Sequence, residues 1–75
     1  MHISAEPTCY YVFEQDSSWL VEFDSQAIAR EFPSRDKALL AAREAAESRW
    51  LMTGNPSCVR VGHPKRQSVV DETYG

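Results

Sequence analysis

The spacing of apolar residues changes twice along this chain, and these changes limit what it can fold into. Before Phe32, apolar residues fall in short runs with the two-residue period of strands, which is clearest at residues 19–24. After Pro33 they recur at helical spacing, and after Pro56 they alternate again. With 75 residues the chain is too short to build a second core. The pattern therefore predicts one small α+β domain.

The first half of the chain has the features of a β-hairpin. Residues 9–14 are rich in aromatic and β-branched types, and residues 19–24 have the two-residue alternation of a half-buried strand. The segment between them, 15–18, contains turn-forming residues. The shorter run 28–32 is expected to add a third strand. We expect Trp19 to be mostly buried under a helix, because a small core needs its largest apolar groups.

A helix is expected from Ser34 to about Trp50. Ser34 is a favourable N-cap, and Asp36 suits the positive end of the helix dipole. Small side chains dominate the predicted inner stripe, which consists of Ala38, Leu39, Ala42, Ala45, Ala46 and Trp50. A stripe of this kind allows the helix to pack closely on a sheet.

Two leucines interrupt the polar face of this helix. Leu40 and Leu51 lie about 20° apart on a helical wheel, with Glu44 and Glu47 between them along the same stripe. These four residues are a candidate protein-contact surface, although single exposed leucines are common. Arg43 and Glu47 have the i, i+4 spacing of an ion pair.

The segment 54–57 holds glycine, asparagine and proline and is expected to end the helix. Residues 58–61 alternate as a returning strand, and 68–72 are expected to form a short closing strand. The predicted order is ββ(β)αβ(β), with the helix packed across an antiparallel sheet of three to five strands. Residues 1–8 are expected to be a flexible lead-in to a single domain over 9–75.

Charge is unevenly distributed along the chain, whose net charge is −3 and whose isoelectric point is about 5.2. Most acids precede Pro33 and most bases follow it. Four residues near the predicted last hairpin form a basic patch: Arg60, His63, Lys65 and Arg66. Such a patch, with Tyr10 or Tyr11 together with Trp19 stacking on bases, is the basis of a nucleic-acid-binding hypothesis. The acidic overall balance opposes it.

Nothing in the sequence has the pattern of a catalytic or metal site. Cys9 and Cys58 are far apart and are predicted to be reduced thiols packed as small hydrophobes. A zinc site would need about four convergent ligands, and a Cys58–His63 nucleophile would need a third orienting group. The acids of the hairpin, Glu14 among them, are expected to be exposed. We therefore predict no enzyme, no metal and no cofactor.

No apolar run approaches the length of a membrane span, and the first residues lack the basic and apolar regions of a signal peptide. The sequence therefore predicts a cytoplasmic protein that does not interact with membranes.

Several short motifs carry a family resemblance over about residues 10–75. They are Trp19-Leu20-Val21, Phe32-Pro33-Ser34-Arg35-Asp36-Lys37-Ala38, Ala41-Ala42-Arg43-Glu44-Ala45-Ala46, Val59-Arg60-Val61 and Thr73-Tyr74-Gly75. In these motifs the chain resembles the small bacterial domain-of-unknown-function family 2188. The resemblance implies a compact sheet with one helix and no catalytic residue. The first two strands and the helix are also similar in topology to the antitoxin half of HicAB toxin systems.

Taken together, these features predict a non-catalytic interaction module. Its partner is an unknown protein or a second copy, bound through an exposed sheet edge or through the leucine stripe. The alternatives are a nucleic-acid-binding module that uses the basic patch, or an antitoxin-like partner of a toxin protein.

Overall fold

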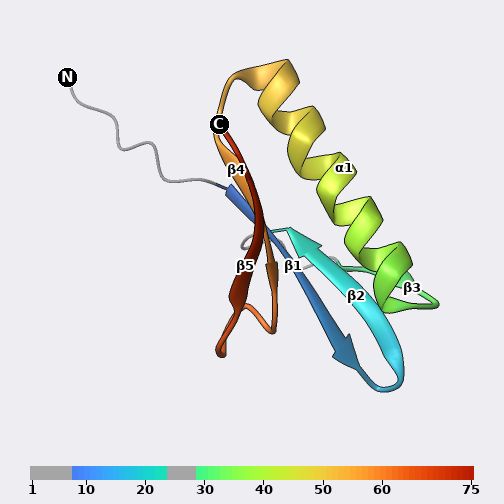
Figure 1. The fold of residues 1–75 in the computed structure, drawn as a ribbon. Helices are drawn as coiled ribbons and strands as arrows, with labels where there is room; N and C mark the ends of the chain where they lie inside the picture. The colour runs from blue at the N-terminus through green and yellow to red at the C-terminus, as the bar shows by residue number, and fades with distance from the viewer. Residues whose placement is uncertain (1–7, 24–28) are drawn as a thin grey trace.

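The structure, a computed structural model, describes residues 8–23 and 29–75. Its elements in chain order are β1 (Thr8–Gln15), β2 (Ser18–Phe23), β3 (Ala29–Phe32), α1 (Arg35–Thr53), β4 (Ser57–Val61) and β5 (Val69–Tyr74). The strands form a sheet, and α1 lies across one of its faces (Figure 1). The predicted α+β fold, with three strands before a helix and two after it, is confirmed.

A tight turn joins β1 to β2, as the sequence predicted. Asp16 and Ser17 have φ angles of 53° and 66°, and Gln15 pairs with Ser18 across the turn. Two successive residues with positive φ are typical of the two-residue turns whose twist matches that of the flanking strands. The hairpin that follows pairs the whole of β2 with β1.

The sheet has the strand order β3-β2-β1-β4-β5 in the described residues and is mixed, not antiparallel as expected. β1 pairs with β4 in parallel, while every other neighbouring pair is antiparallel. The reason is the route of the chain. Two reversals make β3 run in the same direction as β1, and α1 then carries the chain back before β4 begins, so β4 also runs in that direction.

Both short strands that the sequence suggested are present. Residues 29–32 of the predicted third strand form β3 at one edge of the sheet, and Ile28 lies outside the described residues. The closing strand begins at Val69 and runs to Tyr74, so it is longer than predicted and is the other edge. Of the expected lead-in, residues 1–7 lie outside the described residues, and Thr8 pairs with β4.

Side-chain and glycine caps define the ends of α1. The Ser34 hydroxyl accepts a hydrogen bond from the Lys37 amide at 3.2 Å. At the other end, Gly54 has a φ of 74° and its amide donates to the carbonyl of Trp50 at 2.9 Å. The left-handed conformation at Gly54 is common after the last helical residue, where a side chain would add strain. The helix thus ends at Thr53, about one turn later than predicted.

The core lies between α1 and the sheet and is built on small helical side chains. Its buried members are Val12, Ala38, Leu39, Ala42, Ala46 and Val59. Trp19 is half-buried and packs against this cluster, so it is less buried than predicted. Buried Ser57 of β4 donates its hydroxyl to the carbonyl of Ala46 at 2.5 Å, which ties the helix to the sheet.

Candidate functional site

The outer face of α1 carries large apolar side chains that the rest of the described structure leaves uncovered. Leu40 is 57% exposed and Leu51 is 73% exposed, as the helical wheel predicted. Met52, which sequence reasoning missed, is 81% exposed. The helical wheel could have indicated its exposure, because Met52 follows Ser48 of the polar face by four residues. In the structure, Ser48 donates its hydroxyl to the Met52 sulfur at 3.4 Å. We call Leu40, Glu44, Glu47 and Leu51 the outer face of α1; Met52 is exposed near the end of the helix, about 100° around its axis from Leu51.

The two glutamates of this face are exposed, and neither forms an ion pair within the described residues. The sequence predicted an Arg43–Glu47 pair, and this prediction is wrong. The Arg43 guanidinium instead donates from Nε and Nη2 to the two carboxylate oxygens of Asp71 in β5, at 2.8 and 3.0 Å. A fork of this kind satisfies both carboxylate oxygens and is among the stronger side-chain interactions.

This ion pair changes the titration of both partners. The hydrogen bond from Arg43 lowers the pKa of the Asp71 carboxyl below its ordinary value, against the opposing effect of burial. The same hydrogen bond raises the pKa of Arg43. The ion pair fixes α1 to β5 and leaves Glu44 and Glu47 as an uncompensated acidic centre between the exposed apolar residues.

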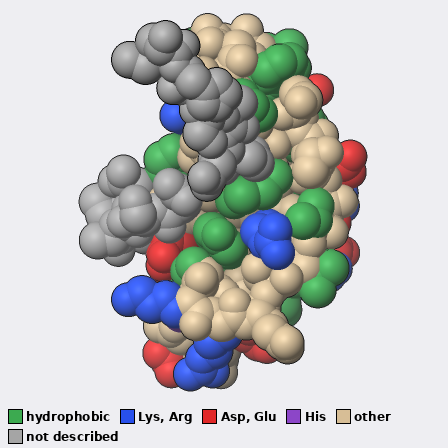
Figure 2. All heavy atoms as spheres, turned by 90° about the vertical axis from the view of Figure 1, so that its left-hand side faces the viewer, with side chains coloured by type: hydrophobic (Ala, Val, Ile, Leu, Met, Phe, Trp, Pro, Cys, Tyr) green, Lys and Arg blue, Asp and Glu red, His purple; other side chains and the backbone are tan. Residues whose placement is uncertain are grey.

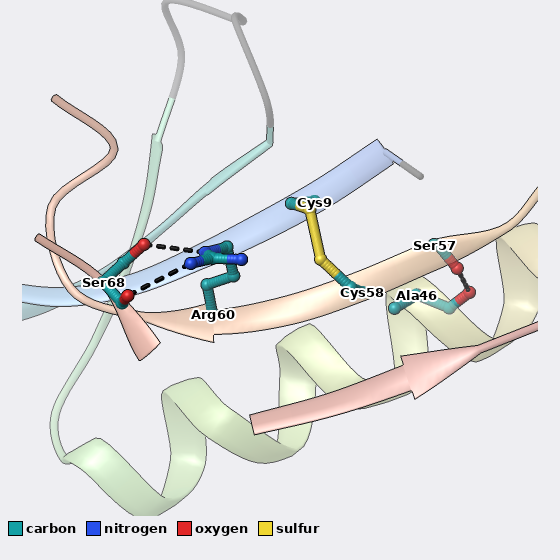
Figure 3. Close-up of a disulfide and its surroundings, with 6 residues drawn as sticks. All are labelled: Cys9, Ala46, Ser57, Cys58, Arg60 and Ser68. Carbon is teal, nitrogen blue, oxygen red and sulfur yellow. Dashed lines mark hydrogen bonds between the residues drawn. A yellow bond between two sulfur atoms is a disulfide. The ribbon is translucent and has the colours of Figure 1, made fainter. Parts of the chain in front are cut away.

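The predicted basic patch is only partly available. Arg60 on β4 donates from Nε to the Ser68 hydroxyl at 2.7 Å and from Nη2 to the Ser68 carbonyl at 3.1 Å (Figure 3). The His63 ring lies 4.8 Å from the Phe13 ring, and its Nδ1 accepts from the Lys65 amide at 3.1 Å. Arg60 and His63 therefore support the β4–β5 connection. Within the patch, Lys65 and Arg66 are the exposed cations.

The two cysteines form a disulfide, so the prediction of reduced thiols is wrong. Cys9 and Cys58 are directly opposite each other on the parallel strands β1 and β4, with their Cα atoms 4.6 Å apart (Figure 3). A separation in this range permits a bridge without backbone movement. Sequence reasoning missed the bond because it depends on the register of β1 against β4, two strands 49 residues apart. With Cys58 bonded, the Cys58–His63 nucleophile weighed from the sequence lacks its thiol.

The sheet face away from α1 carries the disulfide and several apolar side chains. Strand alternation places Tyr11, Phe13 and Leu20 on the same face as Cys9, because Tyr10 and Val12 point toward the helix. Figure 2, which shows the side of the molecule opposite to α1 in Figure 1, has hydrophobic and basic side chains close together there. Among the residues that the structure describes, no group of three histidine, cysteine, aspartate or glutamate residues is arranged to hold a metal ion.

A pocket that sequence reasoning missed lies on the inner side of α1. It has a volume of about 270 Å³ and is lined by Tyr10 of β1, Val21 and Phe23 of β2, Arg30 and Phe32 of β3, and Ala41 and Ala45 of α1. The pocket exists because two alanines, four residues apart on the helix, face large side chains on the strands without filling the space between them. Their spacing opposite an aromatic-rich hairpin was the available signal.

The chain matches no protein-family model, and no curated protein or solved structure is significantly similar to it. The resemblance to the domain-of-unknown-function family therefore stays a prediction, as does the likeness to antitoxins. None of the helices in the described residues is long and apolar enough to cross a membrane.

Proposed function

We propose that this chain is a non-catalytic protein-interaction module that binds its partner through the outer face of α1. The observation that carries the proposal is the exposure of Leu40 and Leu51 on a helix whose other apolar face is already packed. Leu40 and Leu51 are eleven residues apart, which corresponds to about 16 Å along the axis. An exposed apolar surface with a polar rim is typical of protein-contact sites.

The charges of this face indicate the chemistry of the partner. Glu44 and Glu47 lie between Leu40 and Leu51 and have no cation paired to them within the described residues. A partner with apolar side chains on either side of a basic centre would complement this arrangement. Two copies of the chain packed through this face would instead bring like charges together at the centre. We therefore favour a different, basic protein over self-association through α1.

Affinity capture from a native lysate, with and without nuclease, tests the proposal when the captured proteins are identified. Leu51→Asp is expected to remove a specific basic protein from the captured set. Gln15→Asp is the matched control, because Gln15 is exposed at the β1–β2 turn and belongs to none of the proposed contact surfaces. Glu44→Gln with Glu47→Gln is expected to weaken the same interaction and reduce its salt dependence. Capture that Leu51→Asp leaves unchanged would contradict the proposal.

Self-association through β5 is the second candidate, because this edge strand exposes Val69 and Val70. It predicts a concentration-dependent mass in sedimentation experiments that Val69→Lys abolishes and Leu51→Asp does not.

The remaining alternatives are outcomes of the same experiments. Capture that is lost with nuclease, and with Lys65→Ala plus Arg66→Ala, would indicate nucleic-acid binding. A captured toxin would indicate the antitoxin-like function.

The cytoplasmic location also stays a prediction. Cellular reductants would hold Cys9 and Cys58 as thiols there, whereas an oxidising compartment would preserve the bond. Alkylation of intact cells before lysis tests the location: free thiols at Cys9 and Cys58 would support the cytoplasm, and an intact bond would indicate an oxidising compartment. The cysteine pair lies on the opposite face of the sheet from α1, so its oxidation state affects the proposed interaction only through the stability of the fold.

A further inference from the structure

We propose that the pocket between α1 and β1–β3 binds a small organic oxyanion, a molecule with an apolar body and a carboxylate or phosphate group. This site lies on the inner side of α1 and is independent of the outer face. The inference rests on three observations: the size of the pocket, its apolar walls, and two arginines beside it whose charges the described residues leave unpaired.

The size and walls of the pocket suit the apolar body. Ligand pockets usually measure about 300–1,000 Å³, so a volume of about 270 Å³ suits a ligand smaller than a typical drug. Val21 and Phe32 supply apolar walls, and the rings of Tyr10 and Phe23 pack together with centroids 4.8 Å apart. Ala45 forms part of the opposite wall. Aromatic walls of this kind bind flat or short aliphatic groups.

Two guanidinium groups supply the positive charge. Arg30 lines the pocket and lies 5.4 Å from the centroid of the Phe32 ring. Arg49 lies 5.2 Å from the centroid of the Phe23 ring, which is another wall of the pocket. Within the described part of the chain, neither arginine forms an ion pair. Stacking on aromatic rings holds both groups in place without neutralising them.

The Nε atom of Arg49 is the strongest single indication of a missing acceptor. It is buried, and no described residue accepts a hydrogen bond from it. A buried donor without an acceptor is unfavourable, and a carboxylate or phosphate is the acceptor that matches the arginine fork. An oxyanion held here would satisfy Nε while its apolar body occupies the pocket.

Tyr10 adds a neutral donor on the same wall. Its ring lies 4.8 Å from that of Phe23, the same ring over which the Arg49 guanidinium lies at 5.2 Å. Burial raises the pKa of the Tyr10 hydroxyl, and the positive charge of Arg49 acts in the opposite direction. The hydroxyl therefore stays protonated at neutral pH and is able to donate to an anion that Arg49 binds.

The test compares probes that separate the two halves of the ligand. Hydrocinnamate has both the apolar body and the carboxylate, hydrocinnamyl alcohol has the body alone, and inorganic phosphate has the charge alone. Binding is followed by amide NMR shifts of isotope-labelled protein, with the amides of Phe23 and Ala45 as reporters. Hydrocinnamate is expected to bind about tenfold more tightly than either other probe. Phenyl phosphate in its place shows which anionic group binds more tightly, and binding of either supports the proposal.

Variants then assign the effect to the pocket. Arg49→Gln is expected to abolish the preference for hydrocinnamate over the alcohol, and Arg49→Lys to restore part of it. Arg66→Gln removes the same charge from the distant β4–β5 connection and is expected to leave the preference unchanged. Ala45→Leu is expected to abolish binding of both aromatic probes by filling the pocket, and thermal unfolding without ligand confirms that each variant folds.

Four results would overturn the proposal. These are equal affinity for hydrocinnamate and its alcohol, a preference that survives Arg49→Gln, an equal loss in Arg66→Gln, and phosphate binding as tight as that of hydrocinnamate. The first two would remove the role of the arginine, the third would indicate diffuse charge attraction, and the fourth would remove the role of the pocket.

Discussion

Breaking the bond between Cys9 and Cys58 is expected to cost this protein a large share of its stability. The bond closes a loop between residues 49 apart in sequence. Under the chain-entropy model, a loop of this length corresponds to about 4 kcal/mol at 25 °C. A domain of 75 residues has a total free energy of unfolding of about 4–11 kcal/mol. The reduced protein should therefore be close to the limit at which it stays folded.

Equilibrium unfolding in urea, followed by tryptophan fluorescence, measures this difference. Three samples are compared at 25 °C: protein refolded in a glutathione redox buffer, the same protein kept reduced, and the Cys9→Ala/Cys58→Ala variant. The oxidised form is expected to be about 4 kcal/mol more stable than the reduced form, with the variant near the reduced form. The comparison of oxidised with reduced protein isolates the bond itself, because no side chain is replaced.

Two results would refute this reasoning. If the oxidised and reduced forms differ by less than about 1 kcal/mol, the bond does not restrict the unfolded chain as the loop argument requires. If alkylation under denaturing conditions finds free thiols in the refolded sample, β1 and β4 do not bring the cysteines together in the register described.

Three further substitutions test local geometry, and a fourth tests the Arg43–Asp71 pair. Gly62→Ala is expected to lower the free energy of unfolding by about 2 kcal/mol in urea titrations, because the added Cβ would lie 2.7 Å from the Ser68 Cα at a φ of 133°. Gly54→Ala, at a φ of 74° with nothing within 4 Å of the added Cβ, should lower it by only about 1 kcal/mol, and equal effects would contradict the steric argument. Ser17→Gly should raise the unfolding free energy by about 1 kcal/mol, because glycine adopts the positive φ of the β1–β2 turn without the strain of a side chain. An unchanged urea midpoint of unfolding would count against that turn. Arg43 lowers the pKa of the Asp71 carboxyl in the folded protein. The pair therefore stabilises the fold fully at pH values above the ordinary pKa of an aspartate, about 3.9. This stabilisation is lost as the pH falls through the lower pKa that Asp71 has in the folded protein. Asp71→Asn should therefore make unfolding less sensitive to acid, and an unchanged acid profile would show that the pair does not form.

Features that depend on local sequence were predictable here. The turn at 15–18, the cap at Ser34 and the end of the helix at Gly54 each depend on a few neighbouring residues. The alanine stripe of α1 and the exposed Leu40 and Leu51 follow from the period of a helix. Each of these can be deduced from fewer than twenty consecutive residues.

Features that depend on which strands are neighbours could not be predicted in this way. The parallel pairing of β1 with β4, the disulfide and the Arg43–Asp71 pair each join segments more than 25 residues apart. The i, i+4 spacing favoured Glu47 as the partner of Arg43, but the bidentate geometry of Asp71 on β5 is available only after the sheet forms. The pocket was missed for the same reason, since its walls come from four different elements.

The position of β4 also has a consequence for the order of folding. During synthesis β1 and β2 emerge early and can pair at once, yet the other side of β1 must wait until α1 has been made and β4 follows it. Until then the growing chain exposes an unpaired central strand, which is a surface on which nascent chains aggregate. We expect folding to be slow for a domain of this size, with completion of the sheet as the limiting step.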